Sequence, residues 1–298
     1  LNTALKEGKG EYFCCLDADT TVSKKSLKLL LSNFDEQTGA VISTIHVRNP
    51  KRFYNGIQNL EYTFTNFFRT LMMYVGTLAT THGGLSTFNY SILKKVGGFK
   101  EGGLTEDFEI GLRMRSNEYE VKIDPKACTF TAVPSTFKSF WSQRVRWYRG
   151  FFVNHYNYRH MIFNKKYGLL GLFQLPLNIF GVPLLALAMS LILYNLTVNV
   201  TQFFTRTITI DGYFWNHFVK LPNLQDFLIL QDVRILLPVG IGMFLWVISL
   251  VLSHKHINRK VKPSTSIISY LFIHPVLTAL QWFGALFKEV TRMKKVWR

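Results

Sequence analysis

Residues 12–19, Tyr12-Phe13-Cys14-Cys15-Leu16-Asp17-Ala18-Asp19, join a short apolar run to two aspartates. An apolar run without alternation is typical of a strand buried on both faces of an α/β sheet, so we expect a central strand over residues 11–16. Open α/β sheets bind ligands beyond the carboxyl ends of their strands, where Asp17 and Asp19 stand. Because side chains alternate along an extended chain, both carboxylates can face one cation. The alternative is an Asp-capped turn into a helix over residues 23–33.

A second acidic motif, Thr105-Glu106-Asp107, follows glycine-rich residues 82–84 and 97–98 and opens a helical pattern that runs through Arg115. Glu106 and Asp107 could simply complement the dipole of that helix at its amino end. Alternatively, one of these carboxylates could act as a general base that takes the proton of an acceptor hydroxyl.

The third motif is Gln143-Arg144-Val145-Arg146-Trp147, on a helix expected to begin near residue 137. Gln143, Arg146 and Trp147 are three or four residues apart and therefore share one helical face. That face offers an amide, a guanidinium suited to a pyrophosphate, and an indole on which a sugar ring can stack. The alternative is an interfacial helix with a tryptophan anchor, on which Arg144 and Arg149 face phospholipid.

Composition narrows the class of protein. The chain has 298 residues and a formal net charge of +17, which suits an anionic membrane face or an anionic substrate. No zinc-finger spacing or basic repeat supports nucleic acid, so we expect no nucleic-acid partner. The three cysteines, two of them adjacent, offer no metal-ligand spacing and no disulfide framework, which favours a reducing compartment for the globular part.

Three apolar segments, residues 168–194, 233–253 and 264–287, each reach the roughly 20 residues that cross a bilayer. Pro176 and Pro183 predict a kink or break in the first segment. In addition, apolar residues, many of them aromatic, repeat at three- and four-residue intervals over residues 53–75 and predict an amphipathic helix. A helix with aromatic and basic side chains is expected over residues 151–167, and either helix could lie on the cytoplasmic membrane face. For the first of them, packing against the sheet is the alternative.

Charge between the apolar segments predicts their orientation. Residues 195–232 hold few cations and two glycosylation sequons, at Asn195 and Asn199, so we place this loop outside. The basic loop over residues 254–262 then lies inside. A third full span would put the basic tail outside, against the charge rule. We therefore expect a re-entrant hairpin at Pro275.

Residues 1–150 resemble the second half of the catalytic domain of family 2 glycosyltransferases of the processive, membrane-integrated kind. This group contains the cellulose, chitin, hyaluronan and poly-N-acetylglucosamine synthases. The matching residues are Leu1-Asn2, Gly10-Glu11-Tyr12, Leu16-Asp17-Ala18-Asp19, Gly83, Phe88, Val96-Gly97-Gly98-Phe99, Thr105-Glu106-Asp107, Asp124-Pro125, Val133-Pro134 with Thr136, and Gln143-x-x-Arg146-Trp147.

The resemblance implies an α/β fold, namely a partial GT-A (Rossmann-like) domain over residues 1–150. An interfacial helix over residues 151–167 and a transmembrane helical region over residues 168–298 would follow. It also implies a UDP-sugar donor and a Mg²⁺ or Mn²⁺ ion. By the family's pattern, Asp17 and Asp19 are metal and diphosphate ligands, and Gln143 and Arg146 also hold the diphosphate. Asp107 is the catalytic base, with Glu106 as its neighbour, and Trp147 belongs to the acceptor site. His82, Gly83 and Gly84 fall where the family approaches the acceptor, but a histidine is not part of the family's pattern there, and an ordinary loop residue is the alternative for His82.

The implied activity is inverting transfer of a sugar to a growing polysaccharide, coupled to translocation across the membrane. The alternative is a membrane glycosyltransferase that adds one sugar to a lipid acceptor. Either enzyme would be an integral membrane protein with a cytoplasmic catalytic domain. In this family the first half of the domain holds the nucleotide's base and ribose. Because this sequence begins after that half, we expect the fragment alone to be incomplete. Nothing in the sequence identifies the sugar.

Overall fold

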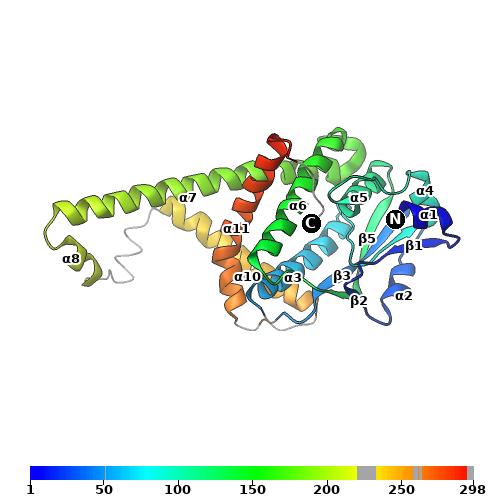
Figure 1. The fold of residues 1–298 in the computed structure, drawn as a ribbon, viewed down its shortest axis with the longest axis horizontal. Coiled ribbons are helices and arrows are strands. Elements are labelled where there is room, and N and C mark those ends of the chain that lie inside the picture. The colour runs from blue at the N-terminus through cyan, green and yellow to red at the C-terminus, as the bar shows by residue number, and fades with distance from the viewer. Residues whose placement is uncertain (51, 220–232, 258–260, 262–263, 294–298) are drawn as a thin grey trace.

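The computed structural model describes residues 1–50, 52–219, 233–257, 261 and 264–293. An α/β domain lies at one end of the molecule and long helices lie at the other (Figure 1). The sheet has five strands in the order β1-β4-β3-β5-β2. Their bounds are Tyr12–Cys15 (β1), Thr20–Val22 (β2), Thr38–Val47 (β3), Ser86–Asn89 (β4) and Glu120–Thr131 (β5).

The expected strand after residue 11 is present as β1, and among the described strands it lies at an edge and not at the expected central position. β1 pairs antiparallel with β4 at one edge of the sheet, and among the described strands it has no second neighbour. The centre is held by β3, which runs parallel to β5 and is buried along nearly its whole length. An apolar run alone does not tell an edge strand from a central one, because one covered face already demands apolar side chains.

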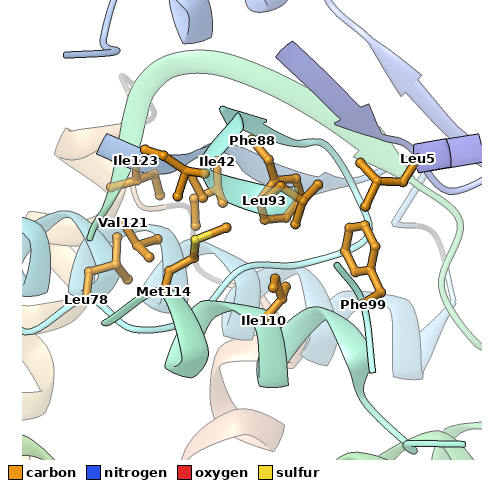
Figure 2. Packing of buried hydrophobic residues seen from close by; sticks show 12 residues of the cluster. Leu5, Ile42, Leu78, Phe88, Leu93, Phe99, Ile110, Met114, Val121 and Ile123 are labelled. Atoms are coloured by element: carbon orange, nitrogen blue, oxygen red, sulfur yellow. The ribbon is translucent and has the colours of Figure 1, made fainter. Parts of the chain in front are cut away.

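The core lies between the sheet and the helix α5 (Glu106–Ser116). Ile110 and Met114, one turn apart on α5, point towards Ile42 and Phe88 of the sheet (Figure 2). The short helices α1 (Asn2–Glu7), α2 (Ser26–Leu31) and α4 (Tyr90–Lys95) complete the domain. This packing fixes the amino end of α5, where the second acidic motif stands.

Six further helices lie in the rest of the described chain. They are α3 (Phe53–Tyr74), α6 (Phe137–Asn157), α7 (Leu175–Thr209), α8 (Tyr213–Val219), α10 (Val233–His256) and α11 (Thr265–Val290). Two 3₁₀ turns, Arg159–Met161 and Lys165–Tyr167, and a π-helix, Leu170–Gln174, join α6 to α7.

Helix α3 joins the two parts of the molecule. One side packs on β3 and β5, and another packs on α10 and α11. Asn66 of α3 fastens it to the sheet, because its amide accepts from the Ile45 backbone N–H at 3.1 Å and donates to the Ile45 carbonyl at 2.8 Å. Sheet packing, offered as one alternative for this helix, is therefore observed, together with packing against the long apolar helices.

Three described helices are long and apolar enough to cross a membrane: Leu170–Thr209, Leu237–His256 and Thr265–Val290. The first is not broken at Pro183, because α7 continues through this residue; a kink there stays a prediction. The loop expected from residue 195 is also wrong at its start, since Asn195 and Asn199 lie inside α7. A proline removes one backbone donor, and local adjustment of the helix can accommodate that loss.

The re-entrant hairpin expected at Pro275 is wrong as well, because α11 is a single helix that contains this proline. Residues 220–232 of the expected outside loop and 258–260 and 262–263 of the basic loop lie outside the described residues. Helix α6 crosses residue 150 without interruption. The division into segments at residues 150 and 167 remains a prediction.

Candidate active site

The three sequence motifs meet in one cleft of about 760 Å³. Its wall includes all ten residues that the sequence singled out: Asp17, Asp19, His82, Gly83, Gly84, Glu106, Asp107, Gln143, Arg146 and Trp147. The cleft lies at the carboxyl ends of β1, β3 and β5, because Asp17, Ile45 and Thr131 also line it. This is the edge at which open α/β sheets bind ligands.

Asp17 and Asp19 stand in the turn between β1 and β2. The Asp17 backbone N–H donates to the Gly83 carbonyl at 2.8 Å, and Asp19 accepts from the Thr131 hydroxyl at 3.3 Å. An added Cβ on Gly83 would lie 2.4 Å from both carboxylate oxygens of Asp17. A side chain at this position would therefore displace the Asp17 carboxylate, which lies close against the backbone.

The Asp17 carboxyl has a raised pKa. Burial is the largest cause, and the nearby carboxylates of Asp107 and Asp19 add to it, while Arg146 opposes the shift. The carboxylates of Asp107 and Asp19, from two motifs, therefore both repel that of Asp17. A bound cation would relieve this repulsion.

Asp107 lies in the first turn of α5, where its Oδ1 accepts from the Phe108 backbone N–H at 2.8 Å. Burial, followed by the neighbouring Glu106, raises its pKa, and Phe108, Arg146 and Arg69 oppose that shift. A carboxylate with a raised pKa is a stronger base than an exposed aspartate, which suits proton transfer near neutral pH.

His82 is buried in the cleft wall. Its Nε2 lies 2.8 Å from the Ser43 carbonyl, which assigns the proton to that nitrogen. Burial, with a further contribution from Arg69, lowers the pKa of His82 to about 3. The imidazole is therefore neutral at physiological pH, and its contacts place it as a fixed part of the wall.

Helix α6 is held against the loop that precedes α5. Arg146 donates to the Leu104 carbonyl at 3.0 Å. A Cβ on Gly150 would lie 2.2 Å from the Thr105 hydroxyl, so only glycine allows this approach. One turn before Trp147, Gln143 accepts from Gln58 of α3 at 3.1 Å. The third motif is thus fixed against both α3 and the second motif.

The lipid-facing alternative for Arg144 and Arg149 is wrong. Both side chains are buried and paired: Arg144 with Glu61 of α3, and Arg149 with Glu289 of α11. Arg149 also donates to the Met293 carbonyl at 2.7 Å. The partners come from helices far away in the sequence, so the pattern of α6 alone could not show them.

The cleft also includes residues on α3 and α11 that the sequence motifs do not contain. Glu61, Thr65 and Arg69 lie four residues apart on one face of α3, and Trp282 of α11 stacks on Tyr148 with ring centroids 4.0 Å apart. The face formed by Glu61, Thr65 and Arg69 also lines a second cavity of about 570 Å³ between α3 and the apolar helices. The sequence could have indicated this face, because three polar residues recur every fourth position in a helix that is otherwise rich in aromatic residues.

Comparison with known proteins identifies the family. Residues 12–283 match the family described as Glycosyl transferase family group 2. Poly-beta-1,6-N-acetyl-D-glucosamine synthases from Staphylococcus epidermidis (strain RP62A) and Staphylococcus aureus (strain COL) are each 31% identical over 153 residues, which is 50% of this chain. The aligned part is 37% of the length of each synthase, well under two thirds.

Among solved structures, a mannosyltransferase from Pyrobaculum calidifontis, in complex with GDP-Man and Mn²⁺, matches with a TM-score of 0.41 and 21% identity. The match covers 72% of this chain and 62% of that one. The family match, the mixed sheet and the three long apolar helices confirm the expected fold class, a GT-A-like α/β domain followed by helices able to span a membrane. The chain belongs to glycosyl transferase family group 2.

Proposed function

We propose that this chain carries the catalytic centre of an inverting, processive glycosyltransferase that extends a polysaccharide from a UDP-sugar and passes it into the membrane. The observation that supports this most is the convergence of three distant motifs on one cleft. Carboxylates, a guanidinium, an amide and an indole are the groups that binding a diphosphate and activating a sugar hydroxyl require.

For the donor, Asp17 and Asp19 would hold Mg²⁺ or Mn²⁺ together with the diphosphate. No group of three or more His, Cys, Asp or Glu suited to a metal occurs among the described residues. Two carboxylates nevertheless fit Mg²⁺, which commonly takes one or two from the protein and the rest from phosphates and water. The bound ion would neutralise charge on the leaving diphosphate. Arg146 and Gln143 would contact the same diphosphate from α6.

For the chemistry, Asp107 would take the proton of the acceptor hydroxyl as that oxygen attacks the anomeric carbon from the face opposite the departing diphosphate. Glu106 would keep the Asp107 carboxyl basic through its negative charge. Trp147 would stack on the terminal sugar of the acceptor, and His82, Gly83 and Gly84 would form the opposite wall of that site.

The second cavity favours a polymer over a single addition. It shares six lining residues with the cleft: Glu61, Thr65, Arg69, Thr80, Phe108 and Phe151. A sugar chain that leaves the cleft would therefore continue between α3 and the apolar helices, with the catalytic domain on the cytoplasmic side. The staphylococcal relatives are named for a β-1,6-linked N-acetylglucosamine polymer, so UDP-N-acetylglucosamine is the first donor to test.

The test is synthesis by the full-length protein in lipid vesicles supplied with radiolabelled UDP-N-acetylglucosamine or UDP-glucose and Mn²⁺. Labelled product that is large on gel filtration and insoluble in organic solvent supports a polysaccharide synthase. Label that partitions into chloroform with one sugar per lipid would instead establish the lipid glycosyltransferase. Absence of any transfer, with Asp107→Asn as the inactive control, would exclude both.

A further inference from the structure

We propose that Glu61 and Arg144 are positioning residues for Trp147: their buried ion pair fixes the indole at the acceptor end of the cleft and ties it to the membrane helices. The proposal rests on the acceptor role given above to Trp147. It gives a role in the site to Arg144, which stands within the third motif without one, and to Glu61, which stands on α3 outside the motifs.

The ion pair is bidentate. Arg144 Nη1 and Nη2 each lie 2.7 Å from one carboxylate oxygen of Glu61. The side chains are 3% and 20% exposed, so the charges are largely withdrawn from water. Two parallel charge-assisted hydrogen bonds fix the plane of the guanidinium as well as its position. Both of these nitrogens are directed to Glu61, which separates the task of Arg144 from that of Arg146.

The guanidinium lies against the indole. Arg144 Cζ is 4.4 Å from the ring centroid of Trp147 and 5.2 Å from that of Phe140. Trp147 follows Arg144 by three residues on α6, so the guanidinium supports the indole from the same helical face. A flat cation held by a carboxylate is a rigid support, whereas a lysine ammonium in its place could not be bidentate or stack in the same way.

Glu61 links this support to the membrane part. It stands on α3, and His274 of α11 lies 3.9 Å from its carboxylate. Tyr270, one turn earlier on α11, stacks on His274 with ring centroids 4.4 Å apart. Glu61 also lines both the cleft and the second cavity. A shift of α11 relative to α3 would therefore move the Glu61 carboxylate and, through Arg144, the indole of Trp147.

A purely structural ion pair would also destabilise the protein when broken, so stability alone does not test the proposal. Helix α6 offers a matched control in Arg149, which forms a buried ion pair with Glu289 of α11. The variants to compare are Arg144→Met, Arg144→Lys, Glu61→Gln and Arg149→Met in the full-length protein. Each is also combined with Trp147→Ala.

The measurements are the KM for an oligosaccharide acceptor, the elongation rate, the affinity for UDP and the melting temperature. Arg144→Met and Glu61→Gln should raise the acceptor KM or slow elongation about tenfold, the order of a lost cation–π contact in a desolvated site. The affinity for UDP should stay within about twofold, and Arg144→Lys should recover only part of the loss.

In the Trp147→Ala background the same two substitutions should cost less than about twofold, because the residue through which they act is already gone. Arg149→Met should lower the melting temperature without changing the acceptor KM. Full additivity with Trp147→Ala, or an equal loss of UDP affinity, would overturn the positioning role. If Trp147→Ala itself elongates normally while the wild type makes polymer, the acceptor role of Trp147 fails and this proposal fails with it, but the polymerase function stands.

Discussion

Gly83 and Asp17 provide the sharpest test of the cleft's geometry. A methyl group at position 83 would lie 2.4 Å from both carboxylate oxygens of Asp17, whereas ordinary contact begins at 3.4 Å. The backbone of Gly83 has an ordinary φ, so Gly83→Ala introduces no backbone strain of its own. The Asp17 side chain must instead withdraw by the difference, which is 1.0 Å.

A displacement of this size is large for a group that positions a substrate. Misplacement of reacting groups by about 1 Å can cost on the order of 100-fold in rate. We therefore expect Gly83→Ala to lower kcat/KM for the UDP-sugar by about that factor and to weaken cation-dependent binding of UDP. The melting temperature should change little, because the displaced carboxylate moves into the open cleft.

The assay is turnover of UDP-sugar by the full-length enzyme over a range of Mn²⁺ concentrations, with UDP binding measured by calorimetry. Gly103→Ala is the matched control, since its Cβ would meet only the Lys100 carbonyl at 3.9 Å. If Gly83→Ala kept wild-type kcat/KM and wild-type cation dependence, the role given to Asp17 in holding cation and diphosphate would be wrong.

Substitutions at four further positions test the site and the packing beneath it. Asp19→Asn should weaken cation-dependent UDP binding while folding persists, and unchanged Mn²⁺ dependence would contradict its metal role. Asp107→Asn should abolish transfer and leave the affinity for UDP near that of the wild type. Burial and Glu106 raise the pKa of the Asp107 carboxyl. Transfer by the wild type should therefore fall as the pH drops through a value above the pKa of an ordinary aspartate. Gly111→Ala would place a Cβ 2.6 Å from the backbone oxygen of Ala79 and should cost about 1–3 kcal/mol in urea unfolding; unaltered stability would show that this contact relaxes freely. Trp147→Ala should suppress elongation far more than donor hydrolysis, Trp147→Phe should retain part of it, and full-length product from the Ala variant at normal rate would make Trp147 a membrane anchor.

Several features were predictable because short-range patterns determine them. Local spacing and composition predict α3, the start of α5 at residue 106 and the three apolar segments. The structure contains helices at all of these places. The prediction of a hairpin at Pro275 was wrong. The charge rule describes how basic tails are distributed, and it does not set the conformation of the apolar segment before them.

The sequence alone determined which residues were candidates, because each motif joins the chemistry of its side chains to a spacing of two to four residues. The tertiary structure decided which of them meet. Asp17, Asp107 and Arg146 lie in one cleft because β1 ends at the same edge as β3 and because α6 packs on the loop before α5.

The tertiary structure also decided that Arg144 is a buried partner of Glu61 and not a lipid contact. A helical pattern defines the faces of its own helix, but the partner of each face is set by packing between segments more than 80 residues apart, here 83. Long-range packing of this kind cannot be derived from the spacing of residues within one segment.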